Sequence, residues 1–213
     1  MDKSFKYKGI NIPSEVIQAL DEGRLAIFAG AGTSLSAGYP CYAKLVESIA
    51  KRCSVHSLPD GTFESKLQIL KNSGHDVHTI AHEVFLEASI QPESKGIQRM
   101  LLELFSDYGS VKVVTTNYDR LFEIATNFLG WDLPSRSTNN LGTAKDFKGI
   151  AHLHGSINDN PRHLILTFED YTRVYHNEPV AKTFLSSLLR NYVVIFIGYG
   201  FNDESINHVI LET

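Results

Sequence analysis

The stretch LAIFAGAGTSLSAGYP, residues 25–40, decides the fold. Its first part, Leu25–Ala29, is a short apolar run typical of a buried parallel strand. Glycines follow at once in Gly30–Pro40, where they allow a sharp turn and a close approach between the backbone and a ligand. A strand that ends in such a turn predicts a Rossmann-type α/β fold.

Strand and helix patterns alternate along the rest of the chain. The other predicted strands are residues 111–115, 150–153, 163–166 and 192–197. The predicted helices are residues 14–21, 43–52, 63–71, 77–88, 95–105, 118–128 and 180–189. This succession predicts an open parallel sheet with helices on both faces.

The chain of 213 residues is expected to form one domain, residues 1–213. Residues 61–106 carry three helical patterns and no strand pattern, which predicts a helical insertion. Residues 131–149 are polar and predict a surface loop near the site. Residues 206–213, INHVILET, resemble the opening of an amphipathic helix without a stop signal, so we expect the natural chain to continue past residue 213.

Composition limits the classes of function. The formal net charge is −4 and no long basic run occurs, which argues against direct nucleic-acid binding. No signal peptide and no apolar run of about 20 residues is present, so a protein of the cytoplasm that does not bind membranes is expected. Two cysteines cannot build a four-cysteine zinc site. His75, His78 and His82 beside Glu83 indicate one face of a helix rather than a metal site, and no metal is expected.

The glycine-rich turn is the first candidate site. Its backbone amides and hydroxyls are suited to the pyrophosphate of a dinucleotide. Leu35 stands three positions after Gly32 where the dehydrogenase fingerprint has glycine, and a simple tight turn is the alternative. The residues predicted to bind are Gly30, Ala31, Gly32, Thr33, Ser34 and Ser36.

The second candidate is TTNYD, residues 115–119, at the end of a predicted strand. Thr116, Asn117 and Asp119 present hydroxyl, amide and carboxylate groups that can hold sugar hydroxyls or a water. Thr, Asn and Asp are also preferred helix caps, so capping is an equally good interpretation.

Two further candidates follow later strands. His154 is suited to general-base chemistry, and Gly155 leaves room beside it, although a lone histidine is more often structural. His152 is expected on the opposite face of its strand. Gly198, Tyr199 and Gly200 follow the run YVVIFI and are predicted to contact an adenosine, with a loop and an Asp203 helix cap as the alternative. All four segments follow predicted strands, so they are expected to meet in one crevice.

Together these segments resemble the sirtuins. GAGTSLSAGYP is similar to the family's GAGxSxSAGxP loop, TTNYD to its TxNxD element, and HLHGS to the strand that ends in its catalytic histidine. Protein-deacylating sirtuins continue the loop with Asp-Phe-Arg and carry a zinc site, whereas this chain has Cys41, Tyr42 and Ala43 and lacks the cysteines. The chain instead resembles the sirtuin-like domains of bacterial antiphage defence proteins, in which GYGxxD endings occur.

That resemblance implies an NAD+ hydrolase that releases nicotinamide and ADP-ribose and depletes NAD+ in abortive infection, with NAD+ as substrate. It implies that Asn117 positions the ribose or the attacking water, that Asp119 organises the pocket, and that His154 accepts a proton. A homo-oligomer, and a regulatory domain or an infection-derived activator, are expected partners. The alternatives are a sensor that binds NAD+ or ADP-ribose, and a protein deacylase or ADP-ribosyltransferase.

Overall fold

The computed structural model describes residues 4–7, 10–88, 96–105 and 107–213. Its centre is a five-stranded parallel sheet in the order β5-β6-β4-β3-β7. The strands are β3 Leu25–Ala29, β4 Lys112–Thr115, β5 Ser135–Ser137, β6 Gly149–His152 and β7 Val193–Ile197. The predicted Rossmann-like parallel sheet is therefore confirmed.

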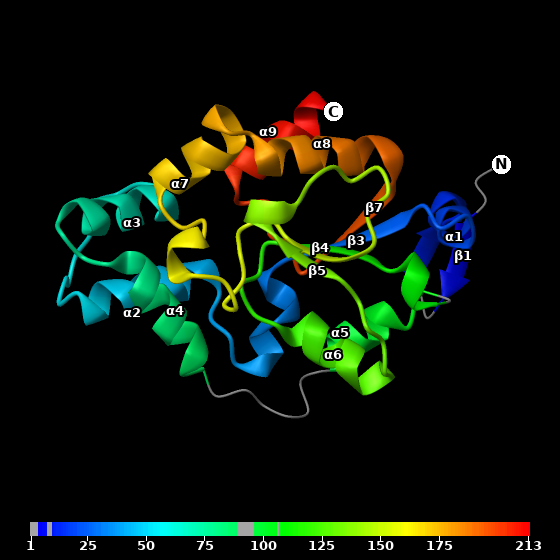
Figure 1. Cartoon of the computed structure of the whole chain (residues 1–213), viewed down its shortest axis with the longest axis horizontal. Coiled ribbons are helices and arrows are strands. Elements are labelled where there is room, and N and C mark those ends of the chain that lie inside the picture. Colours follow the sequence, from blue (N-terminus) through cyan, green and yellow to red (C-terminus); the bar gives the residue numbers. More distant parts are fainter. Residues whose placement is uncertain (1–3, 8–9, 89–95, 106) are drawn as a thin grey trace.

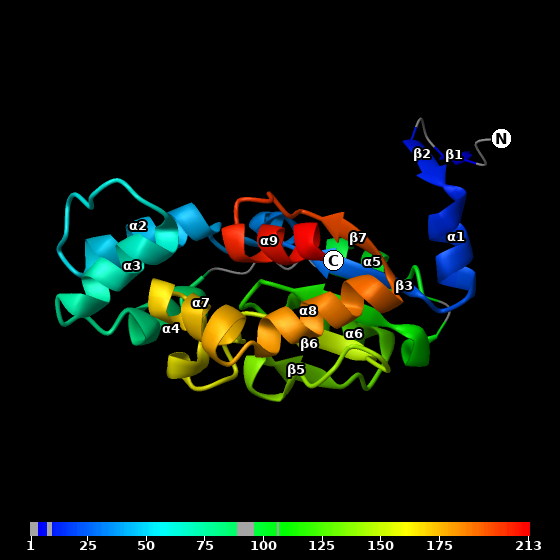
Figure 2. The same cartoon turned by 90° about the horizontal axis from the view of Figure 1, so that it is seen from above.

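Each face of the sheet packs against a pair of helices (Figures 1 and 2). Successive side chains of a strand point to opposite faces. Phe28 of β3 accordingly belongs to the core beneath α8 and α9, whereas Ile27 belongs to the core beneath α5 and α6. The four helices are α5 Gly96–Leu102, α6 Leu121–Leu129, α8 Val180–Asn191 and α9 Glu204–Glu212.

A separate helical layer lies beyond the carboxyl ends of the strands (Figure 1). Its helices are α2 Tyr42–Arg52, α3 Phe63–Asn72, α4 Val77–Leu86 and α7 Phe168–Thr172. Leu45, Leu67 and Ala81 from the first three of these helices share a third core with Leu164 and Leu166. The layer therefore has its own apolar interior and closes the site from the side opposite the sheet.

The N-terminal elements lie at the other end of the sheet. Strands β1 Ser4–Tyr7 and β2 Ile10–Pro13 form an antiparallel hairpin that leads into α1 Ser14–Asp21. Figure 2 shows the hairpin standing apart from the sheet and the helical layer. The sequence analysis found α1 but not the hairpin.

Four of the five predicted strands match strands of the sheet, but the strand predicted at 163–166 is wrong. Pro161–His163 is a 3-10 turn, and residues 164–166 belong to none of the described strands. Tyrosine hydroxyls, rather than a neighbouring strand, bond two carbonyl oxygens of residues 164–166. Tyr118 donates to Ile165 O at 2.8 Å and Tyr42 donates to Leu166 O at 2.7 Å. The run is apolar because Leu164, Ile165 and Leu166 are fully buried between two cores.

The helix predictions differ from the structure mainly at their ends. The pattern at 118–128 corresponds to α6, which begins only at Leu121, and the pattern at 95–105 corresponds to α5, with residue 95 outside the described residues. The predicted loop 131–149 contains β5, the edge strand that pairs with β6. α7 and the π-helical turn Arg173–Asn177 were not predicted.

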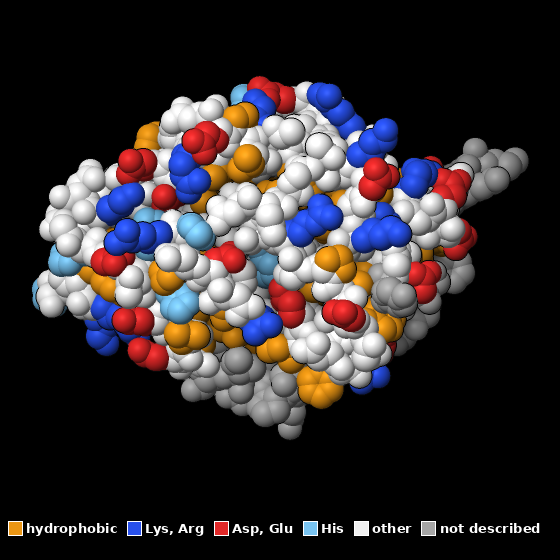
Figure 3. All heavy atoms as spheres, viewed as in Figure 1, with side chains coloured by type: hydrophobic (Ala, Val, Ile, Leu, Met, Phe, Trp, Pro, Cys, Tyr) orange, Lys and Arg blue, Asp and Glu red, His pale blue; other side chains and the backbone are white. Residues whose placement is uncertain are grey.

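Charges are mixed over the surface. On the face shown in Figure 3, acidic and basic side chains alternate among polar ones over the described residues. None of the described helices is both long and apolar enough to cross a lipid bilayer.

Two glycine-bearing turns cross in direct backbone contact at the ends of β3 and β7. The amide of Gly30 donates to Ile197 O at 2.9 Å, and the amide of Gly32 donates to Gly198 O at 2.8 Å. A Cβ atom on Gly30 would lie 2.6 Å from Gly198 O, and one on Gly198 would lie 2.6 Å from the Thr33 amide nitrogen. Side chains cannot fit between the two turns, so glycine is required on both sides.

Replacement of Gly198 by alanine is expected to destabilise the fold far more than replacement of Gly130. Both glycines have positive φ, 62° and 68°, so both substitutions carry a similar backbone cost, roughly 1–2 kcal/mol. Only Gly198 has backbone atoms where the Cβ would go; Gly130 has no atom within 4 Å. Urea unfolding of the two variants measures the difference, and equal free energies of unfolding would contradict the contact.

Candidate active site

A cavity of about 450 Å³ lies between the carboxyl ends of the strands and the helical layer. Its sheet side is formed by the turns after β3, β4 and β7 together with His154, which follows β6. Its other side is formed by residues of α2, α3 and α4, among them Tyr42, Phe63 and Phe85. The expected meeting of the four candidate segments in one crevice is confirmed, and its volume is in the range of small-molecule sites.

Most of the residues predicted from the sequence line this cavity. Those that do are Ala31, Gly32, Ser34, Thr116, Asn117, Asp119, His154, Gly198, Tyr199 and Gly200. Four predicted binding residues are not among the lining residues: Gly30, Thr33, Ser36 and Gly155. No residue of the loop 131–149 lines the cavity, but Thr138 of this loop donates to Leu153 O, next to His154, at 2.9 Å.

Four of the glycines make room for other parts of the backbone, and the ligand contact expected of them stays a prediction. Gly30, Gly32 and Gly198 make room for each other's backbone, as the crossing of the two turns requires. Gly155 has φ 86°, and a Cβ there would lie 2.8 Å from His163 O, so it makes room for the segment after the 3-10 turn. The sequence alone cannot distinguish space for a ligand from space for another part of the backbone.

Asn117 is held by its side-chain nitrogen. The Nδ2 group donates to Gly30 O at 3.1 Å, Thr33 Oγ1 at 3.2 Å and Ser34 Oγ at 2.9 Å. The Thr33 hydroxyl in turn donates to Gly30 O at 2.8 Å, so it is used inside the turn. Because these three oxygens accept hydrogen bonds, the Asn117 amide must point its nitrogen, not its oxygen, toward them. The Asn117 oxygen accepts no hydrogen bond from the described part of the chain and is available as an acceptor at the cavity.

Asp119 shares the Ser34 hydroxyl with this network. Ser34 donates a hydrogen bond to the Asp119 side chain, and Asp119 Oδ1 accepts from the Leu121 amide at 3.0 Å at the start of α6. Burial raises the pKa of the Asp119 carboxyl, and these hydrogen bonds oppose that rise. Asp119 therefore combines both roles considered for it, because it bonds the first turn of a helix and lines the cavity.

His154 is a buried, neutral imidazole. It is 2 % exposed; its Nε2 lies 3.0 Å from the Tyr175 hydroxyl and its Nδ1 lies 3.4 Å from the Tyr171 hydroxyl. Burial lowers the pKa of His154 to about 3, because the charged form loses its hydration. The ring is consequently unprotonated at neutral pH and has one nitrogen able to accept a proton.

His152 supports Asn117 from the opposite face of β6, as the alternation along the strand predicts. Its Nδ1 lies 2.8 Å from Asn117 O and its Nε2 lies 2.8 Å from Glu123 Oε1. Burial of His152 lowers its pKa, but the bond to Glu123 and the charge of that carboxylate, together with the Asn117 carbonyl and Asp119, outweigh burial and leave the pKa raised. This buried pair connects the backbone of Asn117 to α6.

Two tyrosines, Tyr171 and Tyr175, and two acidic residues of the site, Glu64 and Asp203, were not predicted as site residues. Tyr171, Glu64 and Asp203 line the cavity, and Tyr175 lies behind His154. Tyr171 lies in α7 and Tyr175 in the π-helical turn Arg173–Asn177 that follows it, and neither element was predicted. The GYGFND ending did contain Asp203, which was considered only as a cap.

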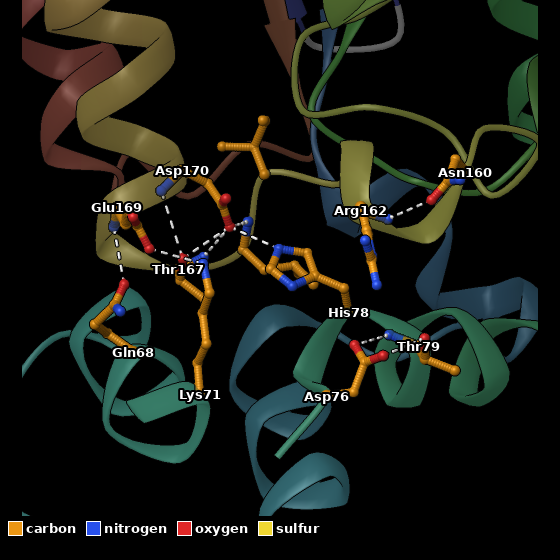
Figure 4. Close-up of polar contacts among 12 residues, drawn as sticks. Gln68, Lys71, Asp76, His78, Thr79, Asn160, Arg162, Thr167, Glu169 and Asp170 are labelled. Atoms are coloured by element: carbon orange, nitrogen blue, oxygen red, sulfur yellow. Dashed lines mark hydrogen bonds and ion pairs between the residues drawn. The ribbon is translucent and has the colours of Figure 1, made fainter. Parts of the chain in front are cut away.

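A polar cluster joins the helical layer to the segment that follows His154 (Figure 4). Asp170 Oδ2 accepts from the Thr167 amide and hydroxyl, at 2.9 and 2.8 Å, and lies 2.8 Å from His78 Nε2. Burial raises the pKa of Asp170, but these partners, His78 foremost, lower it to about 2. On the neighbouring helix, Lys71 Nζ lies 2.8 Å from Glu169 Oε2. The cluster fixes α3 and α4 against α7, which carries Tyr171.

The histidines of α4 are occupied by protein partners. His78 bonds Asp170, and His82 Nε2 lies 2.8 Å from Ile157 O. Among the residues that the structure describes, no group of three His, Cys, Asp or Glu side chains is arranged to hold a metal ion.

Comparison with known proteins agrees with this geometry. Residues 111–212 match the family profile described as the SIR2-like domain. This part of the chain is similar to a SIR2-like domain. The match begins just before β4 and includes the TTNYD, HLHGS and GYGFND segments, which contribute Asn117, His154 and Asp203 to the cavity.

Named relatives extend the similarity to the glycine-rich turn. The chain is 27% identical over 92% of its length to the NAD(+) hydrolase ThsA of Acinetobacter baumannii, and 26% identical over 89% to that of Bacillus cereus. It is 22% identical over 92% to the defense-associated sirtuin 2 of Bacillus subtilis. The chain spans about 40% of the length of the two hydrolases and 20% of the third protein.

The neutral His154 makes stability depend on pH. The unfolded chain protonates this histidine below its ordinary pKa of about 6.5, whereas the folded chain does not until about pH 3, so stability falls as the pH drops through this window. When the pH is lowered from 7.5 to 5.5, the free energy of unfolding in urea is expected to fall by about 1.4 kcal/mol more in wild type than in His154→Gln. Equal losses in the two proteins would contradict a neutral His154.

Proposed function

We propose that this SIR2-like domain hydrolyses NAD+ to nicotinamide and ADP-ribose. The observation that carries the proposal is the position of Asn117 and His154 in the lining of one cavity, where the first has an amide oxygen without a hydrogen bond from the described residues and the second an unprotonated nitrogen. The relatives named NAD(+) hydrolase support the choice of substrate.

In the proposed reaction the bond between C1′ of the ribose and the pyridinium nitrogen breaks. Its electron pair stays with nicotinamide, which is already a good leaving group because it departs as a neutral molecule. The ribose develops oxocarbenium character, a water oxygen bonds to C1′, and the proton of that water leaves. Orientation of the water and acceptance of this proton are the tasks of the protein.

Asn117 and His154 divide these tasks. The Asn117 oxygen, oriented by the three acceptors around Nδ2, receives a hydrogen bond from the water or a ribose hydroxyl. His154 receives the proton at the ring nitrogen that carries no hydrogen. Asp119 holds Ser34, one of the groups that orient Asn117.

The dinucleotide is proposed to lie along the two crossed turns. Ala31, Gly32 and Ser34 line the cavity at the 3-10 turn after β3, where Gly32, which has no side chain, lets phosphate oxygens approach closely. Gly198, Tyr199 and Gly200 are proposed for the adenosine side. Thr116, which precedes Asn117 in the sequence, also lines the cavity.

The biological setting is proposed from the same relatives. A domain of this kind would deplete NAD+ in the cytoplasm during antiphage defence, and it must be inactive in a healthy cell. We propose that a homo-oligomer, together with a regulatory domain or an infection-derived activator, provides this control.

Chromatography of NAD+ after incubation with the 213-residue chain tests the proposal, with His154→Ala and His208→Ala run in parallel. Nicotinamide and ADP-ribose in equal amounts are expected from wild type and from His208→Ala, because His208 is an exposed residue of α9. His154→Ala is expected to lose at least about 100-fold in rate. Saturable NAD+ binding without products would favour a sensor, and products only with an added peptide acceptor would favour a transferase or deacylase.

A further inference from the structure

His154 is placed where a positive charge is costly, although the proposed reaction requires it to become positive. The ring is 2 % exposed and its neighbours at hydrogen-bond distance, Tyr171 and Tyr175, are neutral hydroxyls. Burial lowers the pKa of His154 to about 3, far below that of an efficient base at neutral pH. A nearby negative charge would reduce this cost at the moment of proton transfer.

Asp203 provides such a charge. Its Oδ2 lies 3.8 Å from His154 Nε2, and no other ion-pair partner of His154 occurs among the described residues. Asp203 lines the same cavity, as does Tyr171, which hydrogen-bonds to the Asp203 carboxylate and lies beside the other ring nitrogen. Within the part of the chain that the structure describes, no Lys or Arg side chain lines the cavity to compete for the carboxylate.

The two oxygens of Asp203 have separate partners. Oδ1 accepts from the Ile206 amide at 3.1 Å and caps α9, whereas Oδ2 faces His154. The cap bond from Ile206 therefore uses Oδ1 and leaves Oδ2 directed at His154. A serine or an asparagine would cap this helix as well as aspartate does, so the cap alone does not require a carboxylate.

The hydrogen-bond roles around the ring are consistent with this arrangement. A carboxylate only accepts, so the Tyr171 hydroxyl can donate to Asp203 while its oxygen accepts from Nδ1–H of His154. Nε2 is left as the unprotonated nitrogen, to which the Tyr175 hydroxyl donates. A proton that arrives at Nε2 lies on the side of the ring that faces Asp203 Oδ2.

We propose that Asp203 is a positioning residue that stabilises the imidazolium form of His154 during NAD+ hydrolysis. This inference rests on the proposed function. In the step concerned, the water that attacks C1′ gives its proton to Nε2, the bond to nicotinamide breaks with its electron pair on nicotinamide, and Asp203 stays ionised opposite the new positive charge. The proton then passes to solvent and the ring is neutral again.

The surroundings of Asp203 shift its pKa, so its ionisation should be visible in the pH dependence of the reaction rate. Burial raises the pKa of Asp203, and the carboxylate of Glu204 raises it further, whereas the bonds from Ile206, Tyr171 and Ser205 lower it. Titratable side chains of other elements also face it: Tyr42 of α2, Glu64 of α3, Tyr118, Tyr175 and Tyr199. The reaction should consequently slow at acid pH as Asp203 takes up a proton, above the pKa of an ordinary carboxyl.

Steady-state kinetics of Asp203→Asn tests the inference. The asparagine keeps an oxygen for the Ile206 amide and places an uncharged NH₂ opposite His154. We expect kcat to fall about 100- to 10,000-fold with KM changed less than threefold, and the acid limb of the pH profile to disappear. Asp76→Asn is the matched control, since Asp76 caps α4 in the same way, by accepting from the Thr79 amide at 3.1 Å, and does not line the cavity.

The possible outcomes separate this inference from the function itself. Wild-type activity in Asp203→Asn, or an equal loss in Asp76→Asn, would overturn the role of Asp203 and leave the hydrolase standing. Absence of hydrolysis by wild type would overturn both. If Asp203→Asn fails to fold by circular dichroism, Asp203→Ser replaces it, because serine caps a helix but is too short to face His154; activity in that variant would also overturn the inference.

Discussion

The structure of the site depends on the backbone contact between the turns after β3 and β7. Gly30 and Gly32 meet Gly198 with no space for side chains, and two amide hydrogen bonds join the turns. This contact places GYGFND next to the glycine-rich turn and brings Asp203 to the cavity. Gln98 of α5 supports the same turn by donating to Thr33 O at 2.7 Å. The strand order, with β3 beside both β4 and β7, makes the arrangement possible.

Buried polar groups then determine what the cavity can do. Three acceptors bond the side-chain Nδ2 of Asn117, and His152 bonds its backbone carbonyl oxygen. The orientation of the side-chain amide oxygen is therefore set by the groups that pack around Asn117. His154 is kept neutral by burial between tyrosines. The helical layer holds one of those tyrosines in place through the bond between His78 and Asp170. Binding and proton transfer thus depend on packing far from the reacting atoms.

Much of the fold was predictable because its signals are local. Four of the five predicted strands are apolar runs followed by glycine, asparagine or histidine, and the structure confirms them. The polar residues that follow these runs also indicated that the site lies at the carboxyl ends of the strands. The run at 163–166 was misassigned because full burial makes a segment as apolar as a central strand. β5, with the sequence SRS, carries no apolar signal, since it is a short edge strand with partly exposed residues.

Site residues could be predicted where they stand in a short sequence motif, but not where tertiary structure places them at the cavity. Asn117, Asp119 and His154 stand in short patterns that a single sequence displays. Tyr171 and Glu64 line the cavity, and Tyr175 lies behind His154, on helical segments whose placement depends on tertiary contacts. The glycines were found for a partly different reason, because close approach to a ligand and close approach to another turn require the same residue.

The most direct test of this account is a map of where NAD+ binds. Amide chemical shifts of the His154→Gln variant, recorded by NMR during titration with NAD+, report contacts without requiring turnover. The account predicts that the largest changes fall within residues 31–34, 116–119 and 198–203, most of which line one cavity. Changes confined to other parts of the surface, or none at millimolar NAD+, would contradict it.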